Sequence, residues 1–242
     1  MFAREGTIWN SSMSILRIVA TPIGNLADIT LRALEALKES DFILCEDTRV
    51  TRKLLNHYQI KTPTISYHQH SNEIKIEKII SLLQAGKSLA LVTDAGTPGI
   101  SDPGGNLVSL IREKLKSAVK IESIPGVSAL TTAISLAGRG FDYFLFLGFL
   151  PHKKGRQSKL QEIADSRYPV VLYESKHRIG KLLLELSELE KKNKIKLMVS
   201  IARELTKLHE SFYQGESLAI LQELNSQASN LKGEFVVLLK KV

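Results

Sequence analysis

Short apolar runs alternate with amphipathic stretches along the chain from residue 15, and this alternation restricts the fold more than any other feature. A parallel sheet covered by helices produces such a pattern, because each strand is buried on both faces and each helix buries one stripe of side chains. In the first half we predict strands at 15–20, 42–45, 63–67, 88–92 and 119–124, and helices at 30–40, 51–57, 74–85 and 106–115. Together they make an α/β domain of ordinary size, about 110 residues.

Pro125 and Gly126 interrupt the pattern, and we place a domain junction there. Beyond it we predict helices at 127–137, 177–189 and 218–224, and strands at 144–149, 170–173, 197–202 and 234–239, in a mixed rather than purely parallel sheet. The predicted organisation is an N-terminal α/β domain of residues 13–124 and a C-terminal α/β domain of residues 125–242. Residues 1–12 show no periodicity, so we expect a disordered extension.

Composition excludes several classes of protein. With a single Cys in 242 residues, the chain has no intrachain disulfide framework and no multi-cysteine zinc or iron–sulfur site. No stretch approaches the run of about 20 apolar residues that a transmembrane helix requires. Residues 1–12 also lack the apolar core of a signal peptide. We therefore expect a cytoplasmic protein with no membrane-spanning segment.

The charge balance is compatible with a polyanionic partner. The chain has 33 Lys and Arg against 25 Asp and Glu, a formal net charge of +8. Residues 126–242 hold 18 basic and 12 acidic side chains, whereas residues 1–125 hold 15 and 13, so the excess lies in the second half. Because a modest surplus of Lys also keeps a protein soluble, composition alone favours nucleic-acid binding and simple solubility equally.

Loops that follow predicted strands are the candidate ligand-binding segments, because ligands of open α/β sheets bind outside the carboxyl ends of the strands. These segments are 21–25, 94–105, 125–129, and the pair 173–175 and 202–204. Gly and Pro in the first three let a ligand approach the backbone closely. Neither G-x-x-x-x-G-K nor G-x-G-x-x-G occurs, so a P-loop or Rossmann-type site is not expected. One such loop predicts only a tight turn, but several beside one another favour a bound ligand.

Three other kinds of site have weaker support. His68 and His70 would share one face of a strand, but no third ligand lies at a motif spacing, so we predict no metal. Cys45 ends an apolar run, where a lone thiol is usually part of the core. Ser101 and Ser128 lack the G-x-S-x-G pattern of a nucleophile elbow.

Two basic clusters begin where predicted strands end, PHKKGR at 151–156 and KHR at 176–178. Lys and Arg in such positions can neutralise phosphates, and each neutralised phosphate adds salt-dependent affinity. A third basic run at 191–194 follows a long helix and is interpreted as a solvated turn. The first two clusters are therefore the candidate contacts to a nucleic acid.

Longer sequence motifs contain the candidate loops in a fixed order along the chain. They are VATPIGNL at 19–26, CEDTR at 45–49, DAGTP at 94–98, ISDPG at 100–104, PG and SA at 125–129, GFLP at 148–151, YES at 173–175 and ARELTK at 202–207. With these words the chain resembles the RsmI family of ribosomal RNA methyltransferases, from residue 15 to the C-terminus. Residues 1–12 have no counterpart in the family, and Gly99 and Lys176 differ from the residues that the family most commonly has at these positions.

The resemblance implies the tetrapyrrole methylase fold, in which two α/β domains hold S-adenosylmethionine in the cleft between them, and it implies a homodimer. The implied reaction is 2′-O-methylation of a cytidine in the decoding centre of 16S ribosomal RNA, within the small ribosomal subunit. Carried over position by position, the implied cofactor site consists of Pro22, Gly24, Gly96, Thr97, Pro98, Ile100, Ser101, Asp102, Ser128, Ala129, Tyr173 and Ala202.

A ribose hydroxyl is a poor nucleophile until its proton is removed, so a general base is expected. The candidates are Asp94 and Glu174, which both follow predicted strands. Asp94 could equally cap a turn, and Glu174 could pair with Arg178 across one helical turn. The candidate RNA ligands are Arg49, Lys153, Lys154, Arg178, Arg203 and Lys207.

Two other functions are compatible with the same residues. The scaffold could methylate a tetrapyrrole or a corrin, although the basic second half favours RNA. A non-catalytic RNA-binding module could also have this fold, although intact Gly and Pro positions in every candidate cofactor loop favour an enzyme.

Overall fold

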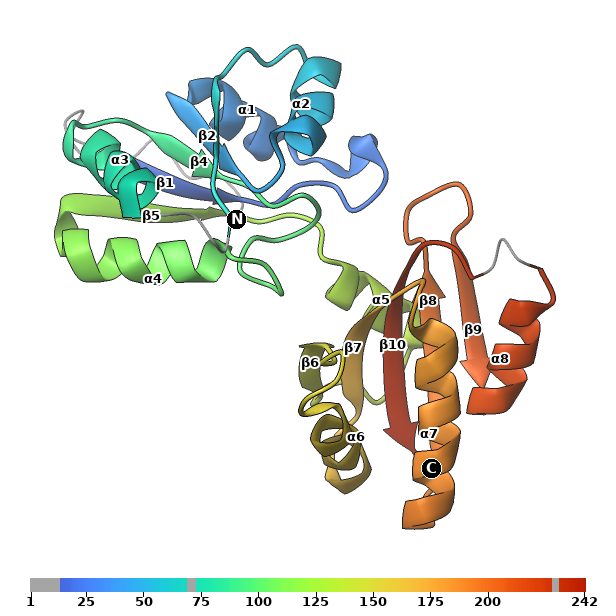
Figure 1. Cartoon of the computed structure of the whole chain (residues 1–242). Helices are drawn as coiled ribbons and strands as arrows, with labels where there is room; N and C mark the ends of the chain where they lie inside the picture. The colour runs from blue at the N-terminus through green and yellow to red at the C-terminus, as the bar shows by residue number, and fades with distance from the viewer. Residues whose placement is uncertain (1–13, 69–72, 228–230) are drawn as a thin grey trace. The chain divides into compact units, whose positions relative to one another are not determined.

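The computed structural model describes residues 14–68, 73–227 and 231–242. The chain forms two compact units, each with its own sheet and core (Figure 1). Unit 1 comprises Leu26–Val127 with the described residues before Ile23, and unit 2 comprises Ser128–Val242 with Ile23–Asn25. The extension expected at residues 1–12 lies outside the described residues.

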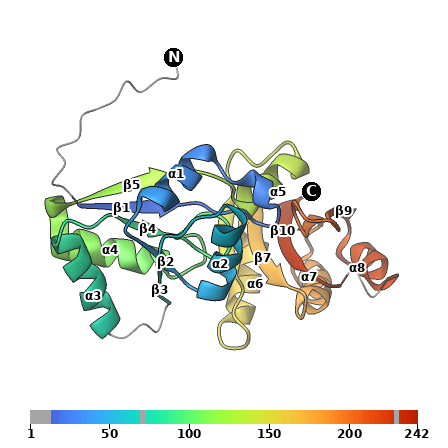
Figure 2. The same ribbon diagram turned by 90° about the horizontal axis from the view of Figure 1, so that it is seen from above.

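Unit 1 is built on a five-stranded parallel sheet. In the order in which they pair, its strands are β3 (Thr64–Ser66), β2 (Phe42–Cys45), β4 (Leu89–Leu91), β1 (Ser14–Val19) and β5 (Val119–Ile124). Strand β4 is central, and β1 lies between β4 and β5 and is parallel to both (Figure 2). The parallel α/β sheet expected from the alternating apolar pattern is therefore confirmed, and its carboxyl ends all lie at one edge.

Two helices cover each face of this sheet (Figure 1). The helices are α1 (Leu31–Glu39), α2 (Thr48–His57), α3 (Glu73–Gln84) and α4 (Gly104–Leu115), with short 3-10 turns at Leu26–Asp28 and Lys116–Ala118. Leu37 of α1 and Leu55 of α2 belong to the core cluster on one face. Ile79 of α3 and Leu107 of α4 belong to the cluster on the other face. Unit 1 is thus a doubly wound α/β unit.

Side-chain caps fix where two of these helices begin. Thr30 Oγ1 accepts a hydrogen bond from the backbone N–H of Ala33 at 3.1 Å, and α1 starts at the next residue. Asp47 Oδ1 accepts from the backbone N–H of Arg49 at 2.8 Å, so α2 begins at Thr48. The predicted start at residue 51 was too late, because a cap worth about 1 kcal/mol extends the helix beyond its apolar pattern.

Unit 2 is built on a five-stranded mixed sheet. In pairing order its strands are β6 (Leu145–Phe149), β7 (Val170–Ser175), β10 (Glu234–Lys241), β8 (Leu197–Arg203) and β9 (Ser211–Gly215). Strands β6 and β7 are parallel, and the other three pairs are antiparallel. This arrangement confirms the mixed sheet expected from the sequence.

The helices of unit 2 divide unequally between the faces of its sheet. They are α5 (Ala129–Ala137), α6 (Arg156–Asp165), α7 (Ile179–Asn193) and α8 (Ser217–Asn225). Leu172 and Val237 point to one face and pack with α6, α7 and α8 in a single core. Their neighbours Tyr173 and Val236 point to the opposite face, where α5 contacts β8 and β10. We call this second side the α5 face.

Two elements of unit 2 were not predicted. Helix α6 has only a few apolar residues in RQSKLQEIAD, and its first residue, Arg156, is a buried cation that the sequence pattern marks as polar. Strand β9 is an edge strand in which Tyr213 is the buried residue, so it shows no apolar run. Among the described residues, no helix is both long and apolar enough to cross a membrane.

Candidate functional site

The carboxyl ends of β1 and β4 form the topological switch point of the unit 1 sheet. These strands are neighbours, yet the chain leaves β1 through α1 on one face and leaves β4 through α4 on the other face. Open α/β sheets bind ligands at such points, because the connections diverge and leave the strand ends accessible. The candidate loops that follow Ala20 and Val92 both begin here.

Backbone hydrogen bonds join these two loops. The Thr21 N–H donates to the carbonyl of Gly96 at 2.9 Å, and the Gly96 N–H donates to the carbonyl of Thr21 at 3.0 Å. The Thr21 hydroxyl also donates to the carbonyl of Thr93 at 3.1 Å. Gly96 has a φ of 84°, a left-handed conformation that a side chain at this position would strain. The sequence therefore requires a glycine where the two loops meet.

Asp102 stabilises the loop at 94–105 through hydrogen bonds to the backbone of that loop. Its carboxylate accepts hydrogen bonds from the backbone N–H groups of Gly99 (2.6 Å), Ile100 (3.1 Å) and Gly104 (2.6 Å). Gly104 is the first residue of α4, so the negative charge also faces the positive end of that helix. Three N–H groups with one acceptor hold the loop in a single conformation, in which Ser101 has a left-handed φ of 61°.

A third loop, after β5, is connected to the same framework. The Thr97 hydroxyl donates to the carbonyl of Val127 at 3.1 Å. A Cβ at Gly126 would lie 2.9 Å from the Cβ of Ala20, so the loop after β5 approaches the end of β1 closely only because residue 126 has no side chain. We refer to these three connected segments as the unit 1 loops. They bring together seven predicted cofactor residues: Pro22, Gly96, Thr97, Pro98, Ile100, Ser101 and Asp102.

Gly24, another predicted cofactor residue, lies in unit 2. A Cβ at this position would come within 2.5 Å of Lys207 Cγ and 3.0 Å of the carbonyl oxygen of Leu205. The next residue, Asn25, donates its backbone N–H to Thr206 Oγ1 at 3.0 Å. The missing side chain of Gly24 thus lets the segment pack on residues 205–207.

Acidic groups lie at the ends of β2 and β4. Asp94 Oδ1 accepts the backbone N–H of Asp47 at 3.1 Å. Burial raises the pKa of Asp94, and the charge of Asp47 raises it further, against the opposing effect of that hydrogen bond. Burial, followed by the charge of Asp94, raises the pKa of Glu46. The hydrogen bond from the Arg49 side chain lowers the pKa of Asp47 to about 2. Asp47 is therefore charged, whereas Asp94 and Glu46 hold protons more readily than ordinary carboxyls.

Unit 2 places four predicted cofactor residues on or beside its α5 face. Ser128 and Ala129 form the start of α5, and Ala202 is fully buried in β8. Tyr173 forms hydrogen bonds with the Ser128 side chain and with the backbone of Leu130. Burial raises the pKa of Tyr173, and these hydrogen bonds only partly offset that effect, so the phenol is neutral at pH 7. The four residues therefore lie on connected elements of one unit.

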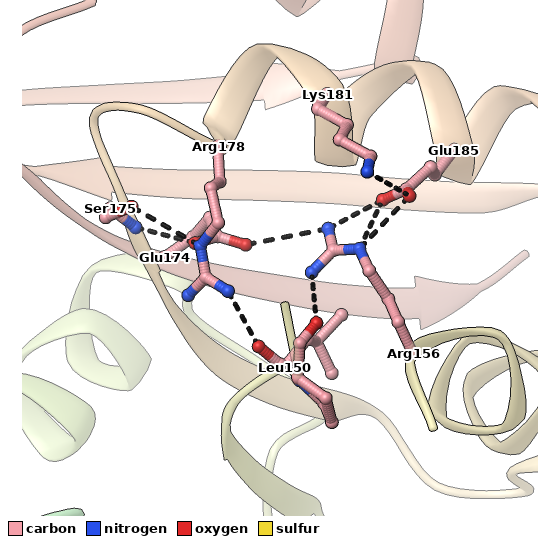
Figure 3. A network of polar contacts seen from close by, with 8 residues as sticks. Leu150, Arg156, Glu174, Ser175, Arg178, Lys181 and Glu185 are labelled. Atoms are coloured by element: carbon pink, nitrogen blue, oxygen red, sulfur yellow. Dashed lines mark hydrogen bonds and ion pairs between the residues drawn. The ribbon is translucent and has the colours of Figure 1, made fainter. Parts of the chain in front are cut away.

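Glu174 occupies the centre of a buried ion-pair network on the opposite face (Figure 3). Its side chain is fully buried, and its carboxylate lies 2.8 Å from Arg178 Nε and 3.8 Å from Arg156 Nη2. Arg156 in turn pairs with Glu185 at 2.6 Å. The two carboxylates and the two guanidiniums balance in charge in the interior, and the exposed Lys181 lies 3.7 Å from Glu185 at the edge of the network. The structure thus contains the Glu174–Arg178 pair that the sequence offered as the alternative to a catalytic role.

Most of the predicted RNA-contacting cations have partners within the protein. Arg49 pairs with Asp47, and Lys207 pairs with Glu204 and Glu234. Arg203 is buried and donates to the carbonyls of Lys232 and His209. Arg178 binds Glu174. Lys153 and Lys154 differ from these, because both are exposed and make no ion pair within the described part of the chain.

A metal site at His68 and His70 was considered from the sequence. His70 lies outside the described residues, so the proposed pairing with His68 has no structural description. Within residues 14–68, 73–227 and 231–242, no group of three His, Cys, Asp or Glu side chains could hold a metal ion.

Two members of the ion-pair network, Arg156 and Glu185, were missed by sequence reasoning. Arg156 ended the basic cluster at 151–156, which was interpreted as a candidate contact to phosphates, although its side chain is only 4% exposed. Glu185 lies on the predicted helix at 177–189, where its position toward Arg156 follows from packing between α6 and α7. Periodicity alone could not identify this pair, because its members are charged and lie 29 residues apart.

Comparisons with known proteins identify relatives over most of the chain. The family model of the tetrapyrrole (corrin/porphyrin) methylases matches residues 16–219. The ribosomal RNA small subunit methyltransferase I of Synechocystis is 44% identical over 228 residues, covering 94% of this chain and 79% of the relative. The protein of the same name from Thermotoga maritima is 44% identical over 204 residues, covering 84% of this chain and 89% of the relative.

Solved structures share the fold at lower identity. A cobalt precorrin-4 methyltransferase superposes with a TM-score of 0.68 at 18% identity and covers 96% of this chain and 98% of its own. The uroporphyrin-III C-methyltransferase of Thermus thermophilus, complexed with S-adenosylhomocysteine, superposes with a TM-score of 0.60 at 19% identity, covering 93% of this chain and 96% of its own. The predicted fold class is confirmed by these matches.

Proposed function

Because the chain belongs to the tetrapyrrole (corrin/porphyrin) methylase family, and within it to the ribosomal RNA small subunit methyltransferase I group, we propose that it methylates small-subunit ribosomal RNA with S-adenosylmethionine as donor. The observation that carries this proposal is 44% identity over 94% of the chain with a relative of that name. The proposed acceptor is the 2′-hydroxyl of a cytidine in the decoding centre of 16S ribosomal RNA, as the sequence words of the family imply.

The unit 1 loops fit such a cofactor. Gly99 is exposed and has a left-handed φ of 91°, so no side chain covers its backbone, and the buried Gly96, with a φ of 84°, joins the loops at the switch point of the sheet. S-adenosylmethionine supplies a methyl group that its sulfonium already activates. The protein must therefore orient the acceptor oxygen and receive its proton. We assign cofactor binding to the unit 1 loops, and the contributions of Gly24, Ser128, Ala129, Tyr173 and Ala202 stay predictions.

We favour Asp94 over Glu174 as the general base. Glu174 is fully buried and paired with Arg178 and Arg156, so its carboxylate is held by cations inside unit 2. Asp94 follows β4 at the switch point, where its carboxyl is partly buried but reaches solvent. Its raised pKa brings the carboxyl closer to neutral pH, which improves a carboxylate as a proton acceptor.

Replacing Asp94 by asparagine is expected to lower kcat by about 10²- to 10⁴-fold, because the amide cannot accept the proton of the hydroxyl. In the unaltered protein, activity should fall as the pH drops through the raised pKa of Asp94. Asp47→Asn removes one charge that raises this pKa, so the acidic limb of kcat should move to lower pH. Single-turnover rates measured against pH test both variants. An Asp94→Asn protein with unaltered kcat would exclude Asp94 as the base.

Methyl transfer from radiolabelled S-adenosylmethionine separates this proposal from its alternatives. We expect label in unmethylated 16S ribosomal RNA or in small ribosomal subunits made from it, and none in a free tetrapyrrole. Label in the macrocycle alone would support a tetrapyrrole methylase. Calorimetry that detects no binding of S-adenosylmethionine would support a non-catalytic RNA-binding module instead.

We also propose that the protein acts in the cytoplasm on the small ribosomal subunit and forms a homodimer. The α5 face of unit 2 exposes Leu136, Met198 and Phe212, each at least 36% accessible. Large apolar side chains that a face leaves exposed support an interface there. Sedimentation velocity should give the mass of a dimer, and a monomer at micromolar concentration would contradict this part of the proposal.

A further inference from the structure

An exposed aromatic ring lies at the carboxyl end of β6. Phe149 is 51% exposed, although its ring centroid lies 5.5 Å from that of Tyr173. Phe146 contacts the same tyrosine ring edge-on, with centroids 5.1 Å apart. Tyr173 is thus held between two phenylalanines, and Phe149 leaves about half of its surface free for a ligand.

A β-bulge turns Phe149 toward this cluster. In a regular strand, residues three positions apart point to opposite faces, yet Phe146 and Phe149 both contact Tyr173. Phe146 pairs with Val171 and Phe149 pairs with Tyr173, so β6 has one more residue than β7 over this interval. Gly148, with a left-handed φ of 58°, takes up the extra residue. The local backbone therefore keeps an apolar ring exposed.

The chain continues from Phe149 directly into the basic cluster at 151–156. Lys153 and Lys154 are exposed, and within the described residues neither makes an ion pair. Arg156, which is buried, and Arg178, which is half-buried, hold the start of this loop (Figure 3). Arg178 donates to the carbonyl of Leu150 at 2.8 Å, and Arg156 donates to the carbonyl of Pro151 at 3.2 Å. The Glu174 network thus fixes the loop that carries the two free ammonium groups.

From these contacts, we infer that Phe149, Lys153 and Lys154 form a binding surface for a single-stranded segment of RNA. A nucleobase stacks on the exposed face of Phe149, and backbone phosphates pair with the two lysines. Glu174, Arg156 and Arg178 act as positioning residues, because they hold the loop without touching the ligand. This inference rests on the proposed function, which supplies RNA as the substrate.

The chemistry of the surface selects single-stranded RNA over other polyanions. Aromatic side chains stack on bases that are free of their neighbours, which occurs in loops and single strands but not inside a duplex. A surface for phosphates alone would need the lysines without the ring, and a surface for an apolar partner would need the ring without the lysines. Here one short segment presents both and is fixed by buried guanidiniums.

Phe149→Leu tests the stacking contact, because leucine keeps the apolar volume and loses the ring. We expect the affinity for a fluorescein-labelled single-stranded oligoribonucleotide to fall about tenfold, which corresponds to about 1.4 kcal/mol for one stacked base. Phe149→Trp should keep or increase the affinity. The preference of the unaltered protein for the single strand over the annealed duplex should disappear in Phe149→Leu. Equal affinities of the leucine variant and the unaltered protein would overturn the stacking contact.

The lysines are tested by the salt dependence of binding. Replacing both Lys153 and Lys154 by alanine should reduce the slope of log K against log salt by about 1.4, because each phosphate contact to a single strand contributes about 0.7. The matched control replaces Lys191 and Lys192, two exposed lysines at the end of α7 in the same unit. It makes the same change in net charge and should leave the slope unaltered. Equal slopes for both double variants would overturn the phosphate contacts.

Methylation assays separate failure of this surface from failure of the proposed function. If the unaltered protein methylates 16S ribosomal RNA, Phe149→Leu should raise KM for the RNA and leave KM for S-adenosylmethionine unaltered. If that variant and the double lysine variant methylate with unaltered KM, the surface is wrong and the proposed function holds. If the unaltered protein binds the oligoribonucleotide through these residues but transfers no methyl group, the surface holds and the proposed function is wrong.

Discussion

Replacing Glu174 by glutamine is expected to lower the free energy of unfolding by about 3–5 kcal/mol, because it removes a fully buried charge that pairs with Arg178 and Arg156. Arg156 would keep its 2.6 Å pair with Glu185, whereas Arg178 would lose its anionic partner and keep neutral acceptors such as the carbonyl of Leu150 and the Ser175 hydroxyl. Urea unfolding followed by circular dichroism measures the loss.

Glu162→Gln is the matched control for this variant. Glu162 pairs with Lys159 in the same unit, but both side chains are more than 40% exposed. Exposed pairs contribute about 0–1 kcal/mol, so this variant should unfold almost as the unaltered protein does. A Glu174→Gln protein as stable as the control would contradict the account of the network.

Glu174→Gln also tests the assignment of the general base. At a temperature where Glu174→Gln is folded, we expect kcat within a few-fold of the unaltered value, because the carboxylate lies inside unit 2. If the Glu174→Gln variant has normal stability and its kcat falls by about 10² or more, Glu174 is the base instead.

Asp102→Ala is expected to weaken binding of S-adenosylmethionine by at least about tenfold, because an unrestrained loop must be ordered when the cofactor binds. The substitution leaves the N–H groups of Gly99, Ile100 and Gly104 without their common acceptor. Loss of the contact to the first residue of α4 should also cost about 1–2 kcal/mol of stability, as for other helix caps. Isothermal titration calorimetry measures the affinity.

Two further variants calibrate the Asp102 result. Asp102→Asn keeps one acceptor oxygen and should give an intermediate affinity. Asp142→Ala removes a charge from an exposed residue of unit 2 and should leave cofactor binding unaltered. An Asp102→Ala protein that binds S-adenosylmethionine as the unaltered protein does would show that this carboxylate does not shape the cofactor site.

The strands of unit 1 were predictable because they are apolar runs bounded by polar residues. Phe42–Cys45 and Val119–Ile124 match the predicted bounds for this reason. Helix α6 and strand β9 escaped prediction because tertiary packing, rather than an apolar pattern, holds them. Arg156 begins α6 inside the core, and Tyr213 is the buried side chain of β9.

The candidate site likewise has some features that the sequence predicts and others that it does not. Gly and Pro mark the unit 1 loops in the sequence, because left-handed angles such as that of Gly96 favour glycine. Contacts that join distant segments leave no such mark. The hydrogen bond from Thr97 to Val127 joins residues 30 positions apart. Arg203, which was predicted to bind RNA, instead donates hydrogen bonds to the carbonyls of Lys232 and His209 within the protein. Only the fold shows which charged side chains have partners.

The central claim is methylation of a ribose in small-subunit ribosomal RNA, and nucleotide-resolution mass spectrometry tests it most directly. Unmethylated 16S ribosomal RNA, alone and assembled into small subunits, is incubated with the purified protein and S-adenosylmethionine and then digested. The account predicts one new 2′-O-methylcytidine, located in the decoding centre. A methyl group on a base, or RNA without any new methyl group in both preparations, would contradict it.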